Sequence, residues 1–250
     1  QLQNIMNNAE DMMNDMIFDL NDKPFIYVTI VNQSFREIMM NWLCNVQIFD
    51  TILDRTLIIA TTKYICDRIQ EEYSEVTCLV ISVPLSFNKD FEDQPIHRRI
   101  FTSFRINIMK RLAQKSIPFV FFESDSIWFR DPSDLFTNMT LIDNIDIAVG
   151  ASSDITHRKP YSSDPLMIFP TNKSILFLEE SIRLIDQGVE QYHHDVINNL
   201  CLSQFNNMVC QLFYWNDIAD GRWFEYGDRE RSVYKPYIVN NNLKQEVEDK

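Results

Sequence analysis

Two acidic side chains directly follow an apolar run near the middle of the chain. The stretch FFESDSIWFRDP covers residues 121–132 and places Glu123 and Asp125 two positions apart. If the chain stays extended there, the two carboxylates project to the same side. Close carboxylates repel each other and resist burial, but a hard divalent cation such as Mn²⁺ or Mg²⁺ relieves the repulsion and also binds diphosphate oxygens. The spacing therefore predicts a metal site for a ligand that carries a diphosphate.

The same residues also fit a purely structural role. Glu123 and Asp125 are compatible with the beginning of a turn that needs no metal. Asp131 is predicted to cap the next helix, because Asp is favoured at the N-cap and the following Pro132 is favoured at the first helical position. The acidic pair alone does not decide between a turn and a metal site.

The first half of the chain alternates strands and helices that position this motif. Apolar, β-branched runs predict strands, and apolar residues at helical spacing predict helices, the first with Ser34 as N-cap. The predicted strands are 24–31, 55–62, 76–82 and 118–122, and the predicted helices are 34–49 and 63–73. Such an order indicates a parallel sheet buried on both faces, whose ligands bind at the carboxyl ends of the strands.

The remaining segments complete a single α/β domain. Residues 83–96 predict a surface loop, and 98–115 a long helix whose inward positions recur every four residues. Those positions are Ile100, Phe104, Ile108 and Leu112. A short helix after Asp131, strands at 145–154 and 165–170 and a helix at 171–187 follow. We predict one domain over residues 1–250, with a polar leader at 1–22 and a less regular second half.

Charge and hydropathy exclude two classes of partner. The net charge is −13 and the pI is about 4.7, so a nucleic-acid backbone would be repelled. No apolar run reaches the roughly 20 residues needed to cross a bilayer, so we expect membrane attachment only through an anchor outside this chain.

The cysteines leave two interpretations open. The five cysteines lack CxxC spacing, which argues against a zinc site. They are either buried thiols or, in an oxidising compartment, two bridges that join Cys66 to Cys78 and Cys201 to Cys210. Three N-x-S/T sequons, at Asn32, Asn138 and Asn172, slightly favour the secretory pathway and a glycoprotein.

Several segments together resemble one enzyme family. VFFESDSIWFRDPSDLF resembles the signature of the nucleotide-diphospho-sugar transferase family, in which a strand ends in D-x-D or E-x-D before an apolar pair and a D-P turn. VTIVNQSFREIMMNWL, IDIAVGASSD, HHDVINNL and DIADGRWFEYG resemble further family segments in the same order. The resemblance implies a GT-A (Rossmann-like) fold, a nucleotide-sugar donor, expected to be a UDP-sugar, and Mn²⁺ or Mg²⁺. It also implies a retaining glycosyltransferase of the Golgi lumen that modifies a glycan or protein acceptor.

The resemblance also implies roles for individual residues. Asp125 would ligate the metal, and Glu123 would contact the ribose or take part in the metal site. Arg105 would lie near the diphosphate or sugar, and Asp195 near the anomeric carbon. Further substrate contacts are implied for Thr29 and Asn32 at the nucleoside, for Asp154 at sugar hydroxyls, and for Asn241.

Each of these residues also has a structural interpretation. Asn32 fits a glycosylated loop residue or a turn former, and Arg105 fits the solvated face of its helix. Asp154 and Asp195 both have favourable N-cap settings. His193 and His194 are adjacent, so we expect their side chains to point apart and not to form a metal site.

Two departures from the family pattern suggest an alternative function. Asn240 stands where the family commonly has a histidine ligand, and Val196 follows Asp195 where the family has glutamine. We expect Asn240 to serve as a metal ligand, because an amide oxygen suits a hard ion, but as a weaker ligand than the imidazole of histidine. The alternative to a transferase is a protein of the same fold that binds a nucleotide sugar or glycan and has lost turnover.

Overall fold

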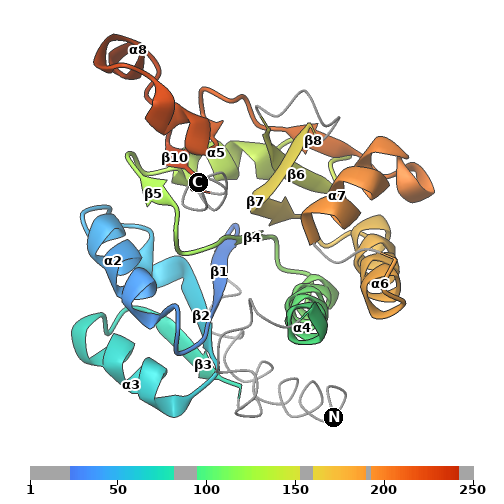
Figure 1. Cartoon of the computed structure of the whole chain (residues 1–250), viewed down its shortest axis with the longest axis horizontal. Helices are drawn as coiled ribbons and strands as arrows, with labels where there is room; N and C mark the ends of the chain where they lie inside the picture. Colours follow the sequence, from blue (N-terminus) through green and yellow to red (C-terminus); the bar gives the residue numbers. More distant parts are fainter. Residues whose placement is uncertain (1–22, 82–94, 153–159, 190–192, 242–250) are drawn as a thin grey trace.

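The computed structural model describes residues 23–81, 95–152, 160–189 and 193–241. In these ranges a seven-stranded sheet has the order β3-β2-β1-β4-β7-β6-β8, with helices on both sides (Figure 1). The predicted leader and nearly all of the predicted loop lie outside the described residues. The expected α/β architecture is confirmed.

The elements agree closely with those expected from the hydrophobic pattern. The strands of the large sheet are β1 (Ile26–Val31), β2 (Thr56–Ala60), β3 (Thr77–Val80), β4 (Phe119–Phe121), β6 (Ile147–Ala151), β7 (Tyr161–Ile168) and β8 (Cys210–Leu212). The helices are α2 (Arg36–Val46), α3 (Lys63–Glu72), α4 (Pro95–Gln114), α5 (Ser133–Thr140), α6 (Asn172–Asp186), α7 (His193–Leu202) and α8 (Asp228–Val233). A small sheet joins β5 (Ile127–Trp128), β10 (Ile238–Val239) and β9 (Ile218–Ala219).

The large sheet is parallel except at one strand. β3, β2, β1 and β4 run parallel to one another, and β8 runs parallel to β6. β7 runs antiparallel to both of its neighbours, β4 and β6. The start of β7 therefore lies at the same edge of the sheet as the end of β4, which decides the composition of the site described below.

Successive residues of the central strands face two different cores. Ile26 and Val28 of β1 pack in the cluster under α4, α6 and α7, whereas Phe25 and Tyr27 pack in the cluster under α2, α3 and α5. This alternation is the period of two that an extended strand imposes. Both faces are apolar because helices cover both.

The starts of two helices differ slightly from the predicted ones. The prediction of Ser34 as N-cap is wrong, because α2 begins at Arg36 and the Asn32 Oδ1 atom accepts the Phe35 N–H at 3.1 Å. The prediction of Asp131 as N-cap and Pro132 as first helical residue is also wrong by one position, because Pro132 is the N-cap of α5, although the Asp131 Oδ1 atom accepts the Ser133 N–H at 2.8 Å. In both places a short polar side chain satisfies a backbone donor that the helix leaves free.

Both suggested bridges are present as disulfides, so the buried-thiol interpretation is wrong for these four cysteines. One links Cys66 of α3 to Cys78 of β3 and the other links Cys201 of α7 to Cys210 of β8. Each bridge ties a helix to a strand of the large sheet. Cys44 is free and exposed.

We expect loss of the first bridge to destabilise the protein. The double substitution Cys66→Ala/Cys78→Ala should lower the free energy of unfolding by about 2 to 3 kcal/mol, because a short covalent loop no longer restricts the unfolded chain. Urea denaturation of both proteins measures this difference. Cys44→Ser is the matched control and should leave stability unchanged; equal losses in the two variants would contradict the expectation.

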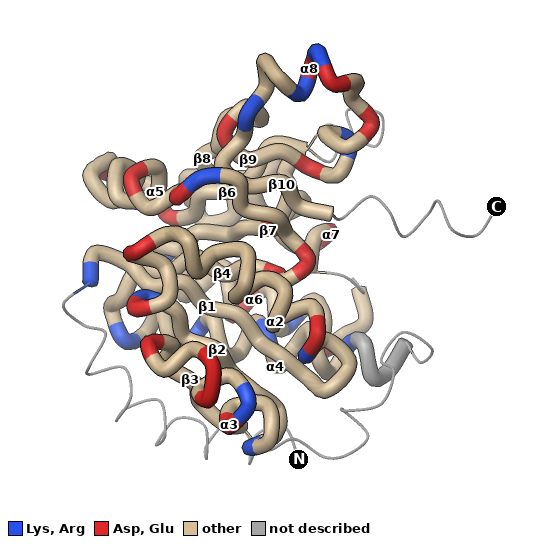
Figure 2. Tube along the Cα trace, turned by 90° about the vertical axis from the view of Figure 1, so that its left-hand side faces the viewer, with Lys and Arg blue, Asp and Glu red and all other residues tan. Residues whose placement is uncertain are grey.

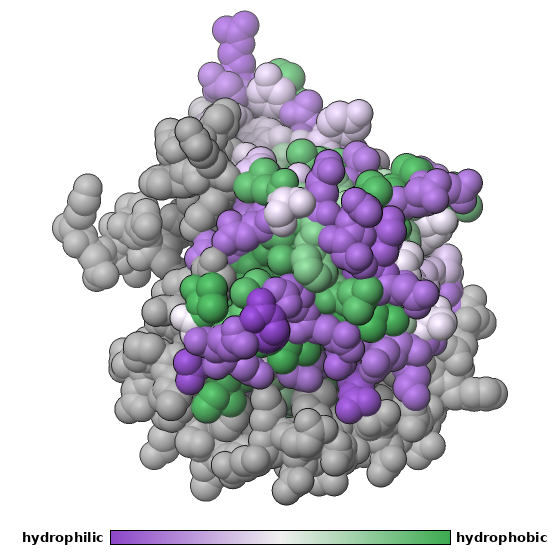
Figure 3. All heavy atoms as spheres, turned by 90° about the vertical axis from the view of Figure 1, so that its right-hand side faces the viewer, coloured by the Kyte–Doolittle hydropathy of each residue, from purple (hydrophilic) through white to green (hydrophobic). Residues whose placement is uncertain are grey.

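The surface of the described chain is mixed in character. Lys and Arg are interspersed with Asp and Glu along the trace in Figure 2. On the face in Figure 3, apolar side chains form small groups between hydrophilic ones. Among the described helices, none is both long and apolar enough to cross a membrane.

Candidate active site

The chain turns sharply after β4. Both the backbone N–H and the hydroxyl of Ser126 donate to the Glu123 carbonyl, at 3.4 and 3.0 Å. The expectation that Glu123 and Asp125 project to one side of an extended chain is therefore wrong, and the turn interpretation is correct for the backbone. The turn separates the directions of the two carboxylates without removing either from this edge of the sheet.

A buried tryptophan fixes the position of this turn. Trp128 packs edge-on against Tyr27, Trp42 and Phe122, and its indole N–H donates to the Ser126 hydroxyl at 3.0 Å. Asn45 of α2 bonds both the N–H and the carbonyl of Trp128. The apolar half of the motif thus anchors the acidic half, because a large buried ring leaves the intervening residues little freedom.

A third carboxylate reaches the site from β7. Phe121 of β4 pairs with Leu166, so the antiparallel register brings Asp164 opposite Glu123. The Glu123 N–H donates to the Asp164 Oδ1 atom at 2.8 Å. On its other side, β7 is irregular between Val149 and Gly150 of β6, where residues 163–165 have no partner in the ladder. This bulge leaves Asp164 free of the β6 ladder and directed to the end of β4.

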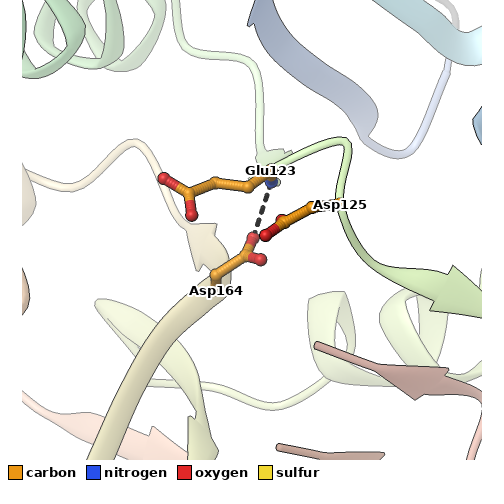
Figure 4. Close-up of side chains that lie close together, drawn as sticks. All are labelled: Glu123, Asp125 and Asp164. Atoms are coloured by element: carbon orange, nitrogen blue, oxygen red, sulfur yellow. Dashed lines mark hydrogen bonds between the residues drawn. The ribbon is translucent and has the colours of Figure 1, made fainter. Parts of the chain in front are cut away.

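Glu123, Asp125 and Asp164 form one cluster. One ligand oxygen from each residue lies within 4.8 Å of those of the other two. Figure 4 shows the carboxylates of Asp125 and Asp164 directed toward each other, whereas the Glu123 side chain extends away from both. Among the described residues, the Asp125 Oδ1 and Asp164 Oδ2 atoms are buried and lack a hydrogen-bond partner. These two oxygens therefore lack the partners that buried polar atoms normally have.

Glu123 instead forms an ion pair with the guanidinium of Arg105. The Arg105 Nη1 atom lies 2.5 Å from the Glu123 Oε1 atom, and the guanidinium also lies 5.0 Å from the centre of the Phe121 ring. Burial opposes ionisation of Glu123, but Arg105 and His194 favour it more strongly, so the pKa of Glu123 is lowered. This carboxylate carries its charge in the absence of a metal.

The pKa values of Asp125 and Asp164 are raised, in contrast to that of Glu123. Burial, followed by the charge of Glu123, raises the pKa of Asp125 to about 6. Burial and the charges of Glu123 and Asp125 raise the pKa of Asp164 well above its ordinary value. Both groups resist ionisation until a positive charge comes close.

This arrangement fits a hard divalent cation. Carboxylate oxygens are the ligands that Mn²⁺ and Mg²⁺ prefer, and a cation would offset both the burial and the repulsion that raise the pKa values of Asp125 and Asp164. Asp125 and Asp164 offer the unpartnered oxygens for it. Glu123 adds negative charge beside them, although its Oε1 atom already accepts from Arg105.

The two adjacent histidines do not point apart as we expected. Their ring centres lie 4.0 Å apart, because both side chains extend toward the strand ends at the start of α7. The His194 Nδ1 atom hydrogen bonds the Ser163 hydroxyl, and the buried His193 Nε2 atom lies 4.0 Å from the Glu123 Oε1 atom. Burial, His194 and Arg105 lower the pKa of His193 well below its ordinary value.

Asn240 reaches the cluster through the backbone. Its side-chain amide donates to the Asp164 carbonyl at 2.7 Å, and its N–H donates to the Ala219 carbonyl at 2.9 Å. The end of β10 thereby supports the bulge that carries Asp164. Asn241 follows it and is half-buried. The predicted roles of both residues toward metal and substrate remain predictions.

The two residues predicted to contact a nucleoside lie at the same edge of the sheet. The Phe122 N–H donates to the Val28 carbonyl, so Thr29 lies beside the segment that leads to Glu123. Thr29 and Asn32 are both buried. Because Asn32 is enclosed and hydrogen bonded, the glycosylated-residue interpretation is incompatible with the folded chain. Their contact with a nucleoside remains a prediction.

The two other predicted aspartates differ in how far they can be placed. Asp195 lies in the first turn of α7, two residues after His193, and is partly buried. Asp154 lies outside the described residues. Their roles at the sugar remain predictions.

Two residues of this site were not predicted from the sequence. Asp164 precedes the apolar run 165–170, and that position would have suggested a site residue only if the strand had been expected to run antiparallel. His193 was considered and set aside on the assumption that adjacent side chains diverge. Neither error concerned residue type; both concerned direction in space.

Arg105 is expected to stabilise the fold through Glu123. Arg105→Met should lower the free energy of unfolding by about 2 to 3 kcal/mol, because it leaves a largely buried carboxylate without its partner. Replacing both residues, as Arg105→Met/Glu123→Gln, should restore most of that loss. Urea denaturation at neutral pH measures both values. If the double variant were no more stable than the single one, the loss would come from packing of the arginine and not from the ion pair.

The chain is similar to known proteins in sequence profile and in fold. The sequence profile of the family described as nucleotide-diphospho-sugar transferase matches residues 51–250. No curated protein matches the sequence. Mouse xyloside xylosyltransferase 1 in its apo form has a similar structure at 9% identity and a TM-score of 0.54, covering 88% of this chain and 98% of that chain.

Two further structures have a similar fold. One is a glycosyltransferase involved in the glycosylation of the major capsid of PBCV-1, with 10% identity, a TM-score of 0.52 and coverage of 86% of this chain and 91% of that one. The other is core-mannan synthase A from Aspergillus fumigatus in an Mn/GDP form, with 9% identity, a TM-score of 0.52 and coverage of 78% and 73%. At such identities the similarity concerns the fold alone.

Proposed function

Because the chain belongs to the nucleotide-diphospho-sugar transferase family and has a glycosyltransferase fold, we propose that it is a metal-dependent, retaining glycosyltransferase. The donor would be a nucleoside-diphosphate sugar, with UDP as the first candidate, and the acceptor a hydroxyl of a glycan or glycoprotein. The observation that carries this proposal is the pair of buried, unpartnered oxygens of Asp125, which follows the end of β4, and of Asp164, in the bulge of β7.

The cluster supports a simple division of roles. Asp125 and Asp164 would hold a divalent cation, with Asn240 supporting Asp164 from behind. When bound, the cation would neutralise negative charge on the leaving diphosphate. Arg105 would add a positive charge beside the same oxygens. Glu123 keeps Arg105 at the site through their ion pair.

The sugar side of the reaction rests on residues whose roles are proposals. Asp195 would stabilise the positive charge that develops at the anomeric carbon as the bond to the diphosphate breaks. Thr29 and Asn32 would contact the nucleoside, and Asp154 and Asn241 the sugar. Substitution of each residue, with donor binding and turnover measured separately, assigns these contacts.

A donor screen tests the proposed function. UDP-, GDP- and CMP-sugars are added with and without Mn²⁺, and both the melting temperature and the release of nucleotide are followed. We expect one nucleotide class to raise the melting temperature only when Mn²⁺ is present, and to be consumed when an acceptor or water is available. If none of the nucleotides stabilised the protein, the proposal would be wrong.

A binding protein without turnover is the second candidate. It is favoured by Asn240, whose side-chain amide is already engaged by the Asp164 carbonyl, and by Val196. In that case the screen would give stabilisation by a nucleotide with no consumption of donor. The same experiment therefore separates the two functions.

The two disulfides favour an oxidising compartment for this activity. Two bridges persist only where thiols are oxidised, as in the secretory pathway. We therefore propose the secretory lumen, and the Golgi within it, as the site of action. Immunolocalisation of the tagged full-length protein tests this assignment; a cytosolic signal would contradict it.

A further inference from the structure

His193 has a buried nitrogen with no explained purpose. Its Nε2 atom is enclosed and has no hydrogen-bond partner among the described residues. Buried polar atoms of native proteins nearly always have one, so an exception calls for an explanation. Burial inside the protein also means that this nitrogen does not face bulk solvent.

A carboxylate acceptor close to this nitrogen is already bonded to another residue. The Glu123 Oε1 atom lies 4.0 Å from the His193 Nε2 atom, which is too far for a hydrogen bond. The same oxygen accepts from Arg105 at 2.5 Å. Arg105 and His193 therefore approach one carboxylate oxygen from α4 and α7, and only Arg105 is bonded to it. A side-chain movement of about 1 Å would bring the His193 nitrogen within hydrogen-bond distance.

Arg105, which is bonded to Glu123, could also bind the diphosphate of the donor. It is bonded to Glu123, whose carboxylate has an oxygen within 4.8 Å of oxygens of Asp125 and Asp164, so it lies close to the cluster that would hold the cation and the diphosphate. A guanidinium binds a phosphate with two parallel hydrogen bonds and is well suited to leave a carboxylate for it. If it leaves, Glu123 becomes a buried charge without a partner, which is strongly unfavourable.

We infer that His193 is a positioning residue that bonds the Glu123 carboxylate when Arg105 turns to the diphosphate of the donor. This inference rests on the proposed function, since it requires a ligand with a diphosphate. Without ligand, Arg105 bonds the Glu123 carboxylate, and the His193 Nε2 atom has no hydrogen-bond partner among the described residues. With ligand, His193 satisfies Glu123, and Arg105 is free to bind the phosphates. The histidine therefore lowers the cost of moving Arg105.

Two substitutions of His193 test the inference. His193→Leu removes the nitrogen, whereas His193→Gln keeps an N–H group at a similar reach. UDP and GDP are titrated into each protein with Mn²⁺ present, Mn²⁺ alone is titrated separately, and the melting temperature is measured without ligands. We expect His193→Leu to bind the nucleotide about tenfold more weakly and His193→Gln to remain within about threefold of wild type. Binding of Mn²⁺ alone and the ligand-free melting temperature should be unchanged or, for Leu, slightly raised.

A second background makes the result specific to Glu123. In Glu123→Gln, the buried group is neutral and no longer needs a replacement partner, so adding His193→Leu should have little further effect on nucleotide affinity. Equal affinities of wild type and His193→Leu would overturn the inference alone. So would a lower melting temperature in both His193 variants with equal losses of affinity, since that result indicates a structural role. If the wild type bound Mn²⁺ but neither nucleotide, the proposed function would fail and this inference with it.

Discussion

Asp164→Asn and Asp125→Asn are each expected to reduce sugar transfer by a factor on the order of 10³. Each substitution removes one of the two buried, unpartnered carboxylate oxygens that we assign to the cation. Without them, the charge that develops on the leaving diphosphate loses its main stabilisation. The measurement is turnover of the donor identified by the screen, with Mn²⁺ in excess.

A matched control distinguishes this result from a general effect of removing a negative charge. Asp134 is an exposed carboxylate in the first turn of α5, and Asp134→Asn should leave turnover unchanged. Circular dichroism and melting curves verify that all variants are folded. Wild-type turnover in Asp164→Asn would mean that the bulge of β7 has only a structural role, and that the cation is held elsewhere.

The second large effect is a dependence of stability on pH and metal. The pKa of Asp125 rises from 3.8 to about 6 in the folded protein. A carboxyl group with a raised pKa holds its proton more tightly when folded, so its contribution favours folding at low pH and is lost as the pH rises through both values. The contribution of Asp125 to the stability of the metal-free protein should therefore fall between about pH 4 and pH 7.

Replacing Asp125 by a neutral residue should remove its destabilising contribution at neutral pH. At about pH 7.5, metal-free Asp125→Asn should be more stable than wild type by on the order of 2 kcal/mol, and its stability should vary less between about pH 4 and pH 7. The comparison of wild type with the variant isolates this group from others that titrate over the same range. Urea denaturation in the presence of a chelator, at several pH values, measures it. If the two pH profiles were parallel, Asp125 would not titrate with a raised pKa.

Mn²⁺ should stabilise the wild type much more than the Asp125→Asn variant. At a hundred times its dissociation constant it would stabilise the wild type by about 2.7 kcal/mol, because it binds only the folded state. For a chain of this size that corresponds to an increase of roughly 5 to 10 °C in melting temperature. Asp125→Asn should lose most of this increase. A variant that is more stable without metal and less stabilised by it is what a charge cluster built for a cation predicts.

The two carboxylates of the motif have different roles in the structure. Glu123 and Asp125 were expected to form one metal site because they are two residues apart. The turn at Ser124 sends Glu123 to Arg105 and leaves Asp125 to meet Asp164 (Figure 4). Glu123 thus forms an ion pair with Arg105, while all three carboxylates remain in one cluster whose third member comes from another strand.

The sequence by itself was sufficient for the elements and for the position of the motif. Alternation of apolar residues in β1 and fourfold spacing in α4 reflect the local geometry of strand and helix, so they could be read directly. The cysteine pairs could be proposed because each closes a short loop between neighbouring elements. Glu123 and Asp125 could be located because a parallel sheet presents its ligand edge at the carboxyl ends of its strands.

Only the tertiary structure decided which side chains meet at that edge. The direction of β7 is set by its pairing with β4 and β6, which are far away in the chain, and no local pattern encodes it. The path of the turn after β4 depends on the packing of Trp128 against Tyr27 and Trp42. The meeting of His193 with Glu123 likewise depends on where α7 docks. Residue types follow from sequence, but the directions of side chains follow from contacts between distant segments, and the chemistry of this site depends on those directions.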